Sequence, residues 1–368
     1  MLLTRLTLAN FRNYAELELE PAPGLNVFVG ANAQGKSNLL EAIAMLGTGK
    51  SFRTAKDADV LRQGFELATV RGEARIRAGL VHIGCSVVRT VRGTRKSYTV
   101  NGRDVRYASY LGKLRVVTFV PADLQLATGA PALRRALLNG ALAQEEPQYY
   151  RELARYRKAL QQKNALLRDP ASLDPELLAI YERTLVEAGT QLVLARNHFV
   201  TAIALEARRA HERIAGGAEH FEAAYAPNVP FEVPTADGVA AALEARFRAV
   251  AETERARKSA VAGPHRDDLE LRLDGRSLAA YGSQGQQRTA VLALKIAEYA
   301  VMRERSAEAP LLLLDDVLSE LDERRAAAFL AGIGDYEQAF VTATHLPGGL
   351  PAGACVTRIA SARLERAA

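Results

Sequence analysis

The segment Gly30-Ala31-Asn32-Ala33-Gln34-Gly35-Lys36-Ser37 has the form G-x-x-x-x-G-K-S of a phosphate-binding loop. Residues 25–29 before it are mostly apolar and predict a buried strand. Apolar residues after it recur at the spacing of a helix with one buried face (Leu39, Leu40, Ile43, Leu46). A strand, a loop and a helix in this order let backbone N–H groups surround phosphates. We expect Lys36 to reach the β- and γ-phosphates of a nucleotide and the Ser37 hydroxyl to bind Mg²⁺.

The composition is that of an ordinary globular protein. The chain has 368 residues, enough for one large domain or two smaller ones, and 48% of them are hydrophobic. The sequence contains no apolar run near the roughly 20 residues that span a bilayer, and its first residues lack the apolar core of a signal peptide. Cys85 and Cys355 do not have the spacing of a zinc site or a disulfide framework. We therefore expect a soluble, cytoplasmic protein without a membrane partner.

Positive charge is concentrated in one segment. Eight basic residues and one acidic residue lie between positions 86 and 116, so this segment carries more positive charge than the net +6 of the whole chain. Such a patch suits DNA, because each neutralised phosphate releases counterions. The candidate DNA-contacting residues are Arg89, Arg92, Arg95, Lys96, Arg103 and Arg106. A solvated hairpin face explains the same charges equally well. Basic residues at 151–158 extend the candidate surface.

The periodicity predicts an α/β fold in which a mixed sheet carries the loop and an α-helical lobe is inserted. Apolar residues alternate as in strands near both ends of the chain, and Asn101-Gly102 is a strong hairpin turn. Between residues 131 and 258 the period becomes helical, and two apolar series predict a short antiparallel, coiled-coil-like hairpin. We expect three parts: residues 1–128 and 261–368, which form the ATPase lobe, and residues 129–260, which form the helical insertion.

A second motif, Leu311-Leu312-Leu313-Leu314-Asp315-Asp316, is an apolar strand that ends in two carboxylates. We expect this strand to lie beside the strand that precedes the phosphate loop. Asp315 would then hold Mg²⁺ through water, and Asp316 would polarise the attacking water as a general base. The alternative is an ordinary strand that ends in an acidic turn residue. That alternative explains one aspartate but not two.

A third motif, Ser283-Gln284-Gly285-Gln286-Gln287, opens a helix and predicts an anion site without a lysine. It resembles the signature motif of ABC-type ATPases, which begins a helix before the strand that carries the carboxylates. In that class two heads pair head-to-tail, and the signature of one head caps the γ-phosphate held by the other. The same resemblance implies a D-loop with Ser319 and Asp322, and a switch histidine at His345.

The details resemble the RecF family of recombination-repair ATPases, which is related to SMC and Rad50 heads. The likeness extends along the whole chain, through blocks at residues 10–14, 35–42, 51–53, 129–135, 263–268 and 283–288. It implies ATP and Mg²⁺ as cofactors, with Asn38 and Arg53 near the phosphates and slow hydrolysis. Three departures stand out: Ala122 replaces a usual acid, Asn139 replaces a usual aspartate, and Gln125 is only the nearest match to the Q-loop glutamine.

This resemblance implies an ATP-dependent homodimer that binds single-stranded gaps or junctions in DNA. It also implies action with RecO and RecR in the loading of RecA. One alternative is the ATPase subunit of an ABC transporter, which usually has a clear Q-loop and a surface for membrane-domain helices. Another is an SMC- or Rad50-like chromosome-maintenance ATPase, whose arms are far longer than this insertion. A nuclease-linked relative would carry an acid-rich domain after the ATPase.

Overall fold

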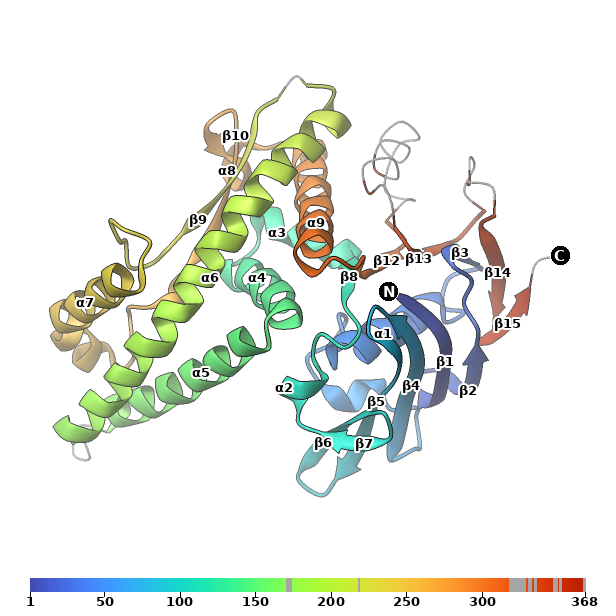
Figure 1. Ribbon diagram of the computed structural model, residues 1–368, viewed down its shortest axis with the longest axis horizontal. Coiled ribbons are helices and arrows are strands. Elements are labelled where there is room, and N and C mark those ends of the chain that lie inside the picture. The colour runs from blue at the N-terminus through green and yellow to red at the C-terminus, as the bar shows by residue number, and fades with distance from the viewer. Residues whose placement is uncertain are drawn as a thin grey trace.

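The structure is a computed structural model that describes residues 1–169, 174–217, 219–317, 329, 333, 336–346, 350 and 353–366. A sheet-rich part, built mainly from the two ends of the chain, lies beside a helical part (Figure 1). Among the described residues, no helix is long and apolar enough to cross a membrane.

The central sheet contains the strand that leads into the phosphate loop. Its order is β15-β14-β3-β13-β12-β8, with β15 antiparallel and the other strands parallel. The bounds are β3 Gly24–Val29, β8 Val116–Phe119, β12 Leu311–Asp315, β13 Gln338–Ala343, β14 Cys355–Ala360 and β15 Arg363–Arg366. Both faces are covered, which explains the unbroken apolar run in β12. Leu311 and Leu313 pack with helix α1 (Lys36–Thr48), whereas Leu312 and Leu314 face helix α9 (Gln284–Ser306).

An antiparallel sheet of order β2-β1-β4-β5-β6-β7 covers the other side of α1. Its bounds are β1 Leu2–Phe11, β2 Tyr14–Leu19, β4 Leu67–Ile76, β5 Gly79–Thr90, β6 Gly93–Val100 and β7 Arg103–Val105. The predicted hairpin turn is present, with both Asn101 (φ 51°) and Gly102 (φ 74°) in the left-handed region. Asparagine and glycine are the residues that such a two-residue turn favours.

The helical part contains the predicted antiparallel hairpin. It is formed by α5 (Pro147–Arg168) and α6 (Pro175–Ala215), packed through Tyr149, Leu153, Leu185 and Leu192. Helix α6 has 41 residues and continues well beyond the predicted apolar series, so it is about 60 Å long. It ends at Gly216, which adopts a left-handed conformation. The other helices are η1 Asp57–Val60, α2 Tyr107–Tyr110, η2 Pro121–Leu124, α3 Gln125–Thr128, α4 Pro131–Glu145, α7 Ala236–Arg257, η4 Pro264–Arg266 and α8 Leu278–Tyr281.

The helical part also contains a small sheet that the periodicity does not predict. Strand β9 (Phe221–Ala226) pairs antiparallel with β10 (Asp268–Leu273), and β11 (Arg276–Ser277) completes the order β11-β10-β9. The sequence predicts β10 as a strand, but its partner comes from within the range assigned to the helical insertion. This pairing fixes the chain just before α8 and α9 against the end of α6, where β9 begins.

Candidate nucleotide site

The phosphate loop connects β3 to α1, as its sequence predicts. At Gly30 a Cβ atom would lie 2.3 Å from the carbonyl oxygen of Ile359 on β14, so only glycine fits there. Gly35 has a φ of 113°, which strongly favours glycine. The Lys36 ammonium donates hydrogen bonds to the carbonyls of Gly30 (2.6 Å) and Ala31 (2.8 Å). The loop therefore curls around its own lysine, with its backbone N–H groups at the start of a helix.

A turn near the end of the chain braces this loop. The backbone N–H of Ser361 donates to the Gln34 side chain at 2.6 Å, and the N–H of Ala362 donates to the Gln34 carbonyl at 3.0 Å. Both turn residues have positive φ, 48° and 59°. Sequence patterns do not predict this brace. The only local signal is the short Ala-Ser-Ala stretch between two strands, which does not indicate what the turn touches.

Several residues from the family-like blocks form a hydrogen-bonded network behind the loop. Glu41 of α1 is fully buried and accepts two hydrogen bonds from Arg12, at 2.8 and 2.5 Å. It also accepts one from the Ser51 hydroxyl at 2.5 Å. Arg53 donates to the Asn38 side chain at 2.5 Å and lies 3.7 Å from Glu41. The network therefore attaches Arg53 to the first turn of α1, beside the loop.

The two carboxylates lie near the loop, but the predicted strand order was wrong. Strand β13 separates β3 from β12, because sheet order depends on crossovers that local sequence does not encode. Thr342 of this intervening strand contacts both aspartates. Its hydroxyl donates to Asp315 at 2.8 Å and accepts the backbone N–H of Asp316 at 2.9 Å. Asp316 has a φ of 53°, a strained conformation of the kind that clusters at functional sites.

The electrostatics of Lys36 indicate that the three charged groups form one cluster. Burial lowers the pKa of the Lys36 ammonium, and the nearby carboxylates of Asp316 and Asp315 oppose that shift. Lys36 and Asp315 are both buried, with 7% of their surface exposed. The loop and the end of β12 can therefore surround a single charged ligand from two sides.

Four further residues are predicted to belong to the nucleotide site: Ser319, Asp322, His345 and Gln125. Ser319 and Asp322 lie outside the described residues. His345 follows β13 and is exposed. Gln125 begins α3 with its side chain exposed, and no hydrogen bond joins it to the loop within the described part of the chain.

The signature-like segment forms the N-terminus of α9. The Ser283 hydroxyl accepts the Gln286 N–H at 3.3 Å, and the Gln286 side chain accepts the Ser283 N–H at 2.8 Å. This reciprocal arrangement is a capping box. Ser283 and Gln284 are exposed, Gly285 to Gln287 are half-buried, and the Gln287 side chain donates to the Gly282 carbonyl at 2.8 Å. The exposed helix start can receive an anion.

The loop and the signature lie apart in the chain's fold. Helix α1 lies in the right half of the molecule, whereas α8, which leads into the signature, lies in the upper left half (Figure 1). No hydrogen bond or ion pair joins residues 30–38 to residues 281–287 among those the structure describes. The two candidate anion-binding elements are therefore separate within one copy of the chain.

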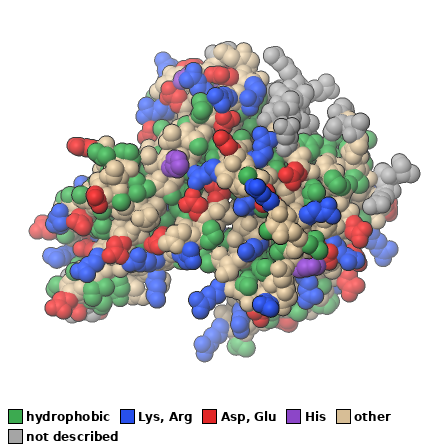
Figure 2. Space-filling view, viewed as in Figure 1, with side chains coloured by type: hydrophobic (Ala, Val, Ile, Leu, Met, Phe, Trp, Pro, Cys, Tyr) green, Lys and Arg blue, Asp and Glu red, His purple; other side chains and the backbone are tan. Residues whose placement is uncertain are grey.

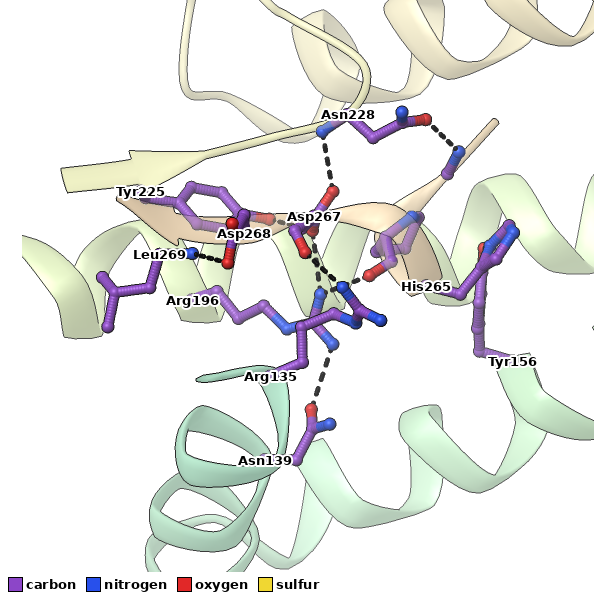
Figure 3. Close-up of polar contacts among 12 residues, drawn as sticks. Arg135, Asn139, Tyr156, Arg196, Tyr225, Asn228, His265, Asp267, Asp268 and Leu269 are labelled. Atoms are coloured by element: carbon purple, nitrogen blue, oxygen red, sulfur yellow. Dashed lines mark hydrogen bonds and ion pairs between the residues drawn. The ribbon is translucent and has the colours of Figure 1, made fainter. Parts of the chain in front are cut away.

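The Gly263–Asp268 block is the centre of a buried polar network in the helical part (Figure 3). The Asp267 carboxylate accepts a hydrogen bond from Arg196 of α6 at 2.8 Å, and both side chains are 2% exposed. The same carboxylate accepts the Tyr225 hydroxyl and the Asn228 N–H. Asn139 of α4 also belongs to this network, because its side-chain oxygen accepts hydrogen bonds from Arg196 (3.0 Å) and Tyr149 (2.6 Å).

The basic segment forms the β5–β6–β7 hairpins. Lys and Arg side chains project over this lower edge of the molecule in Figure 2. The exposed members are Arg89, Arg92, Arg95, Arg103 and Arg106. Lys96 differs, because its side chain is only 19% exposed and contacts Asp57 (2.8 Å) and the Gly49 carbonyl (3.0 Å). Arg95, the preceding residue in the strand, points to the opposite face and is exposed. The concentration of basic residues in the sequence therefore overestimates the number of cations that face solvent.

The fold, with a phosphate loop after β3 and paired carboxylates after β12, is that of an ABC-type ATPase head. The family model described as "RecF/RecN/SMC N terminal domain" matches residues 2–348. The chain belongs to the RecF family within that group.

Relatives support this assignment along the whole chain. The DNA replication and repair protein RecF of Symbiobacterium thermophilum is 42% identical over 349 residues, covering 94% of this chain and 92% of that protein. The RecF of Gloeobacter violaceus is 41% identical over 354 residues, covering 94% and 92%. A solved structure of the recombination mediator protein RecF with ATP has a TM-score of 0.91 and 31% identity, covering 100% of this chain and 98% of that one. The SMC head domain of Pyrococcus furiosus, at 18% identity and a TM-score of 0.55, shares the fold.

Proposed function

We propose that the chain is an ATP-binding protein of DNA replication and repair whose nucleotide site is completed by a second copy. In each copy the loop Gly30–Ser37 holds the phosphates, with Asn38 and Arg53 beside them. Residues Ser283 to Gln287 of the other copy cap the γ-phosphate. The name of the relatives, DNA replication and repair protein, and the ATP in one solved relative support this proposal.

The separation of the two anion-binding elements carries the proposal. The loop is curled around Lys36, and the helix start at Ser283 is capped and exposed. The two elements nevertheless lie in different halves of the folded molecule (Figure 1). Since one nucleotide cannot contact both within one copy, a pair of copies related by a two-fold axis completes two sites at once. ATP then contributes free energy to dimerisation.

The side chains at the site also suit Mg²⁺. The Asp315 carboxylate is held by Thr342, and Ser37 lies in the first turn of α1. Carboxylate and hydroxyl oxygens are hard ligands of the kind that Mg²⁺ prefers. When bound, the ion would neutralise phosphate charge. We propose that Asp316, which directly follows β12, polarises the attacking water as a general base, and that the protein is a weak ATPase. We retain His345, Gln125, Ser319 and Asp322 as further proposed residues of this site.

We propose that the DNA partner is bound without base-specific contacts, at gaps or at junctions of single- and double-stranded DNA. The exposed arginines of the β5–β7 hairpins supply positive charge for phosphates, and no base-reading motif is visible in the sequence. RecO and RecR are the proposed protein partners. A solved relative is described as part of the RecFOR pathway, which supports this choice.

Sedimentation with and without ATP tests the composite site. We expect the wild-type protein to dimerise only with ATP, and the Lys36→Arg and Ser283→Arg variants to remain monomeric. A gel-shift series tests the DNA step, with ATP expected to strengthen binding. Full ATP-dependent dimerisation by both variants would sink the composite site. A DNA affinity that is the same with and without ATP would contradict the proposed coupling between nucleotide binding and DNA binding.

A further inference from the structure

Glu219 connects the end of the longest helix to the signature-like segment. It lies between α6 and β9, with 25% of its side chain exposed. One carboxylate oxygen accepts a hydrogen bond from the side-chain nitrogen of Gln286 at 2.9 Å. The oxygen of the same Gln286 amide accepts the N–H of Ser283 at 2.8 Å. A residue from the helical insertion therefore fixes the side chain that caps the signature.

The chemistry of this contact selects one orientation of the Gln286 amide. An ionised carboxylate only accepts hydrogen bonds, so the NH₂ group of Gln286 must face Glu219. The amide oxygen is then directed toward the Ser283 N–H, which only donates. With Glu219 absent, the amide loses one of the two partners that fix its rotamer and its flip state.

Glu219 also lies near a buried histidine of α6. Its second oxygen lies 3.6 Å from a ring nitrogen of His211, which is fully buried on α6. The His211 ring stacks on Phe221 of β9, with centroids 5.2 Å apart and an interplanar angle of 26°. Burial lowers the pKa of His211, so its ring is neutral near pH 7 and does not compete as a strong donor for the carboxylate.

The contact is not needed to end α6. The N–H groups of Gly216 and Gly217 both donate to the Glu212 carbonyl at 3.0 Å, and this pair already terminates the helix. The hydrogen bond from Gln286 to Glu219 therefore has its main effect on α9, on the side where the signature begins.

We infer that Glu219 is a positioning residue for the signature, through which the helical insertion sets the shape of the anion site at Ser283. This inference rests on the proposed function for the role of the signature in the dimer. The hydrogen bond that defines it is a property of the single chain.

The first test measures hydrogen–deuterium exchange of the nucleotide-free protein in peptides that contain residues 282–287. The Ser283 amide has its partner in the Gln286 side chain. We expect Glu219→Ala to speed its exchange about 2- to 10-fold, as the loss of one ordinary hydrogen bond implies. Glu219→Gln, which can still accept, should be intermediate. The matched control is Glu222→Ala, an exposed neighbour on β9 that contacts His220 instead. Wild-type exchange in Glu219→Ala would overturn the inference.

The second test measures the dissociation constant of the ATP-bound dimer. We expect Glu219→Ala to weaken the dimer by a similar factor while binding of ATP to the monomer is unchanged. In a Gln286→Ala background, the Glu219→Ala change should have no further effect, because the two residues act through one contact. A general structural defect would persist in that background. If the wild-type protein does not dimerise with ATP, the proposed function is wrong. The exchange experiment still tests whether Glu219 positions the signature, because it uses the nucleotide-free protein.

Discussion

The hydroxyl of Thr342 donates a hydrogen bond to Asp315 and accepts one from the backbone of Asp316. One side chain on β13 therefore holds the carboxylate of Asp315 and the backbone of Asp316, at the end of the neighbouring strand. This matters because β13, and not β12, is the strand next to the phosphate loop strand. Thr342 therefore lies on the strand between the loop strand and the two aspartates.

Replacing Thr342 by valine tests this relationship, since valine keeps the shape and removes the hydroxyl. The change removes the donor to the buried Asp315 carboxylate and the acceptor of the partly buried Asp316 N–H, so we expect a loss of about 1–3 kcal/mol in the free energy of unfolding. ATP hydrolysis should also require more Mg²⁺ for half-maximal rate. Urea unfolding and a Mg²⁺ titration of the ATPase measure the two effects. Thr342→Ser keeps the hydroxyl and is the control. Unchanged stability and Mg²⁺ dependence in the valine variant would contradict the assigned role.

Mixing two inactive variants tests whether the site is shared between copies. Lys36→Arg has an intact signature, and Ser283→Arg has an intact loop. A heterodimer of the two contains one complete site and one doubly damaged site. We therefore expect ATP-dependent association to appear in the mixture, although neither variant associates alone. Sedimentation of equal amounts, with one variant fluorescently labelled, measures this. A mixture that behaves as the sum of its components would show that loop and signature do not meet in trans.

The exposed arginines of the hairpins predict how DNA binding depends on salt. Changing Arg92 and Arg95 to glutamate should weaken binding to all sequences alike. It should also reduce the slope of log affinity against log salt by about 0.9 for each duplex phosphate that the protein no longer neutralises. Fluorescence anisotropy from low to physiological salt measures both. The control is Arg248→Glu, an exposed arginine on α7. A DNA affinity and slope equal to wild type would make the hairpins an ordinary solvated face.

Lys96→Met gives a contrasting result, because Lys96 points to the other face and contacts Asp57. We expect this variant to lower the melting temperature and to leave the salt slope unchanged.

The half-buried His265 predicts a loss of stability in acid. Burial lowers its pKa from 6.5 to about 4, although its Nδ1 lies 2.7 Å from the Tyr156 hydroxyl. The unfolded chain takes up a proton near pH 6.5, whereas the folded chain resists until about pH 4. This contribution is complete above pH 6.5 and is lost as the pH falls toward 4. At 1.36 kcal/mol per pKa unit it amounts to roughly 3 kcal/mol.

Urea unfolding at a series of pH values between 7 and 4 measures this loss. His265→Gln should flatten the acid slope, and exposed His198→Gln should leave it unchanged. An unaltered slope in the His265 variant would assign the acid sensitivity to other groups.

The sequence predicts the local parts of this molecule well. The glycines and lysine of the loop, the unbroken apolar run of β12 and the Asn101-Gly102 turn each have a local physical cause. Strand β9 is hard to predict because its sequence is rich in alanine, which is common in helices. The position of β12 and the brace of Ser361 on Gln34 depend on contacts between distant parts of the chain, which no local pattern contains.

Lys96 shows why the number of basic residues in a segment does not give the number that face solvent. A strand directs neighbouring side chains to opposite faces, so a run of basic residues cannot form a single surface. The pairing of Val87 with Lys96 and of Val88 with Arg95 assigns the two faces. Val87 is 1% exposed and Val88 is 37% exposed, so the pleat itself identifies which cation faces solvent.

Strand β3 is hydrogen-bonded on one side to β13 and on the other to β14. Both neighbours are synthesised long after the phosphate loop has left the ribosome. A growing chain therefore carries the loop without this sheet until β13 and β14 have been made, and the turn at Ser361 follows β14. The phosphate loop thus acquires its supporting sheet only after strands far along the chain have been made, so a shorter nascent chain lacks the frame that shapes the loop.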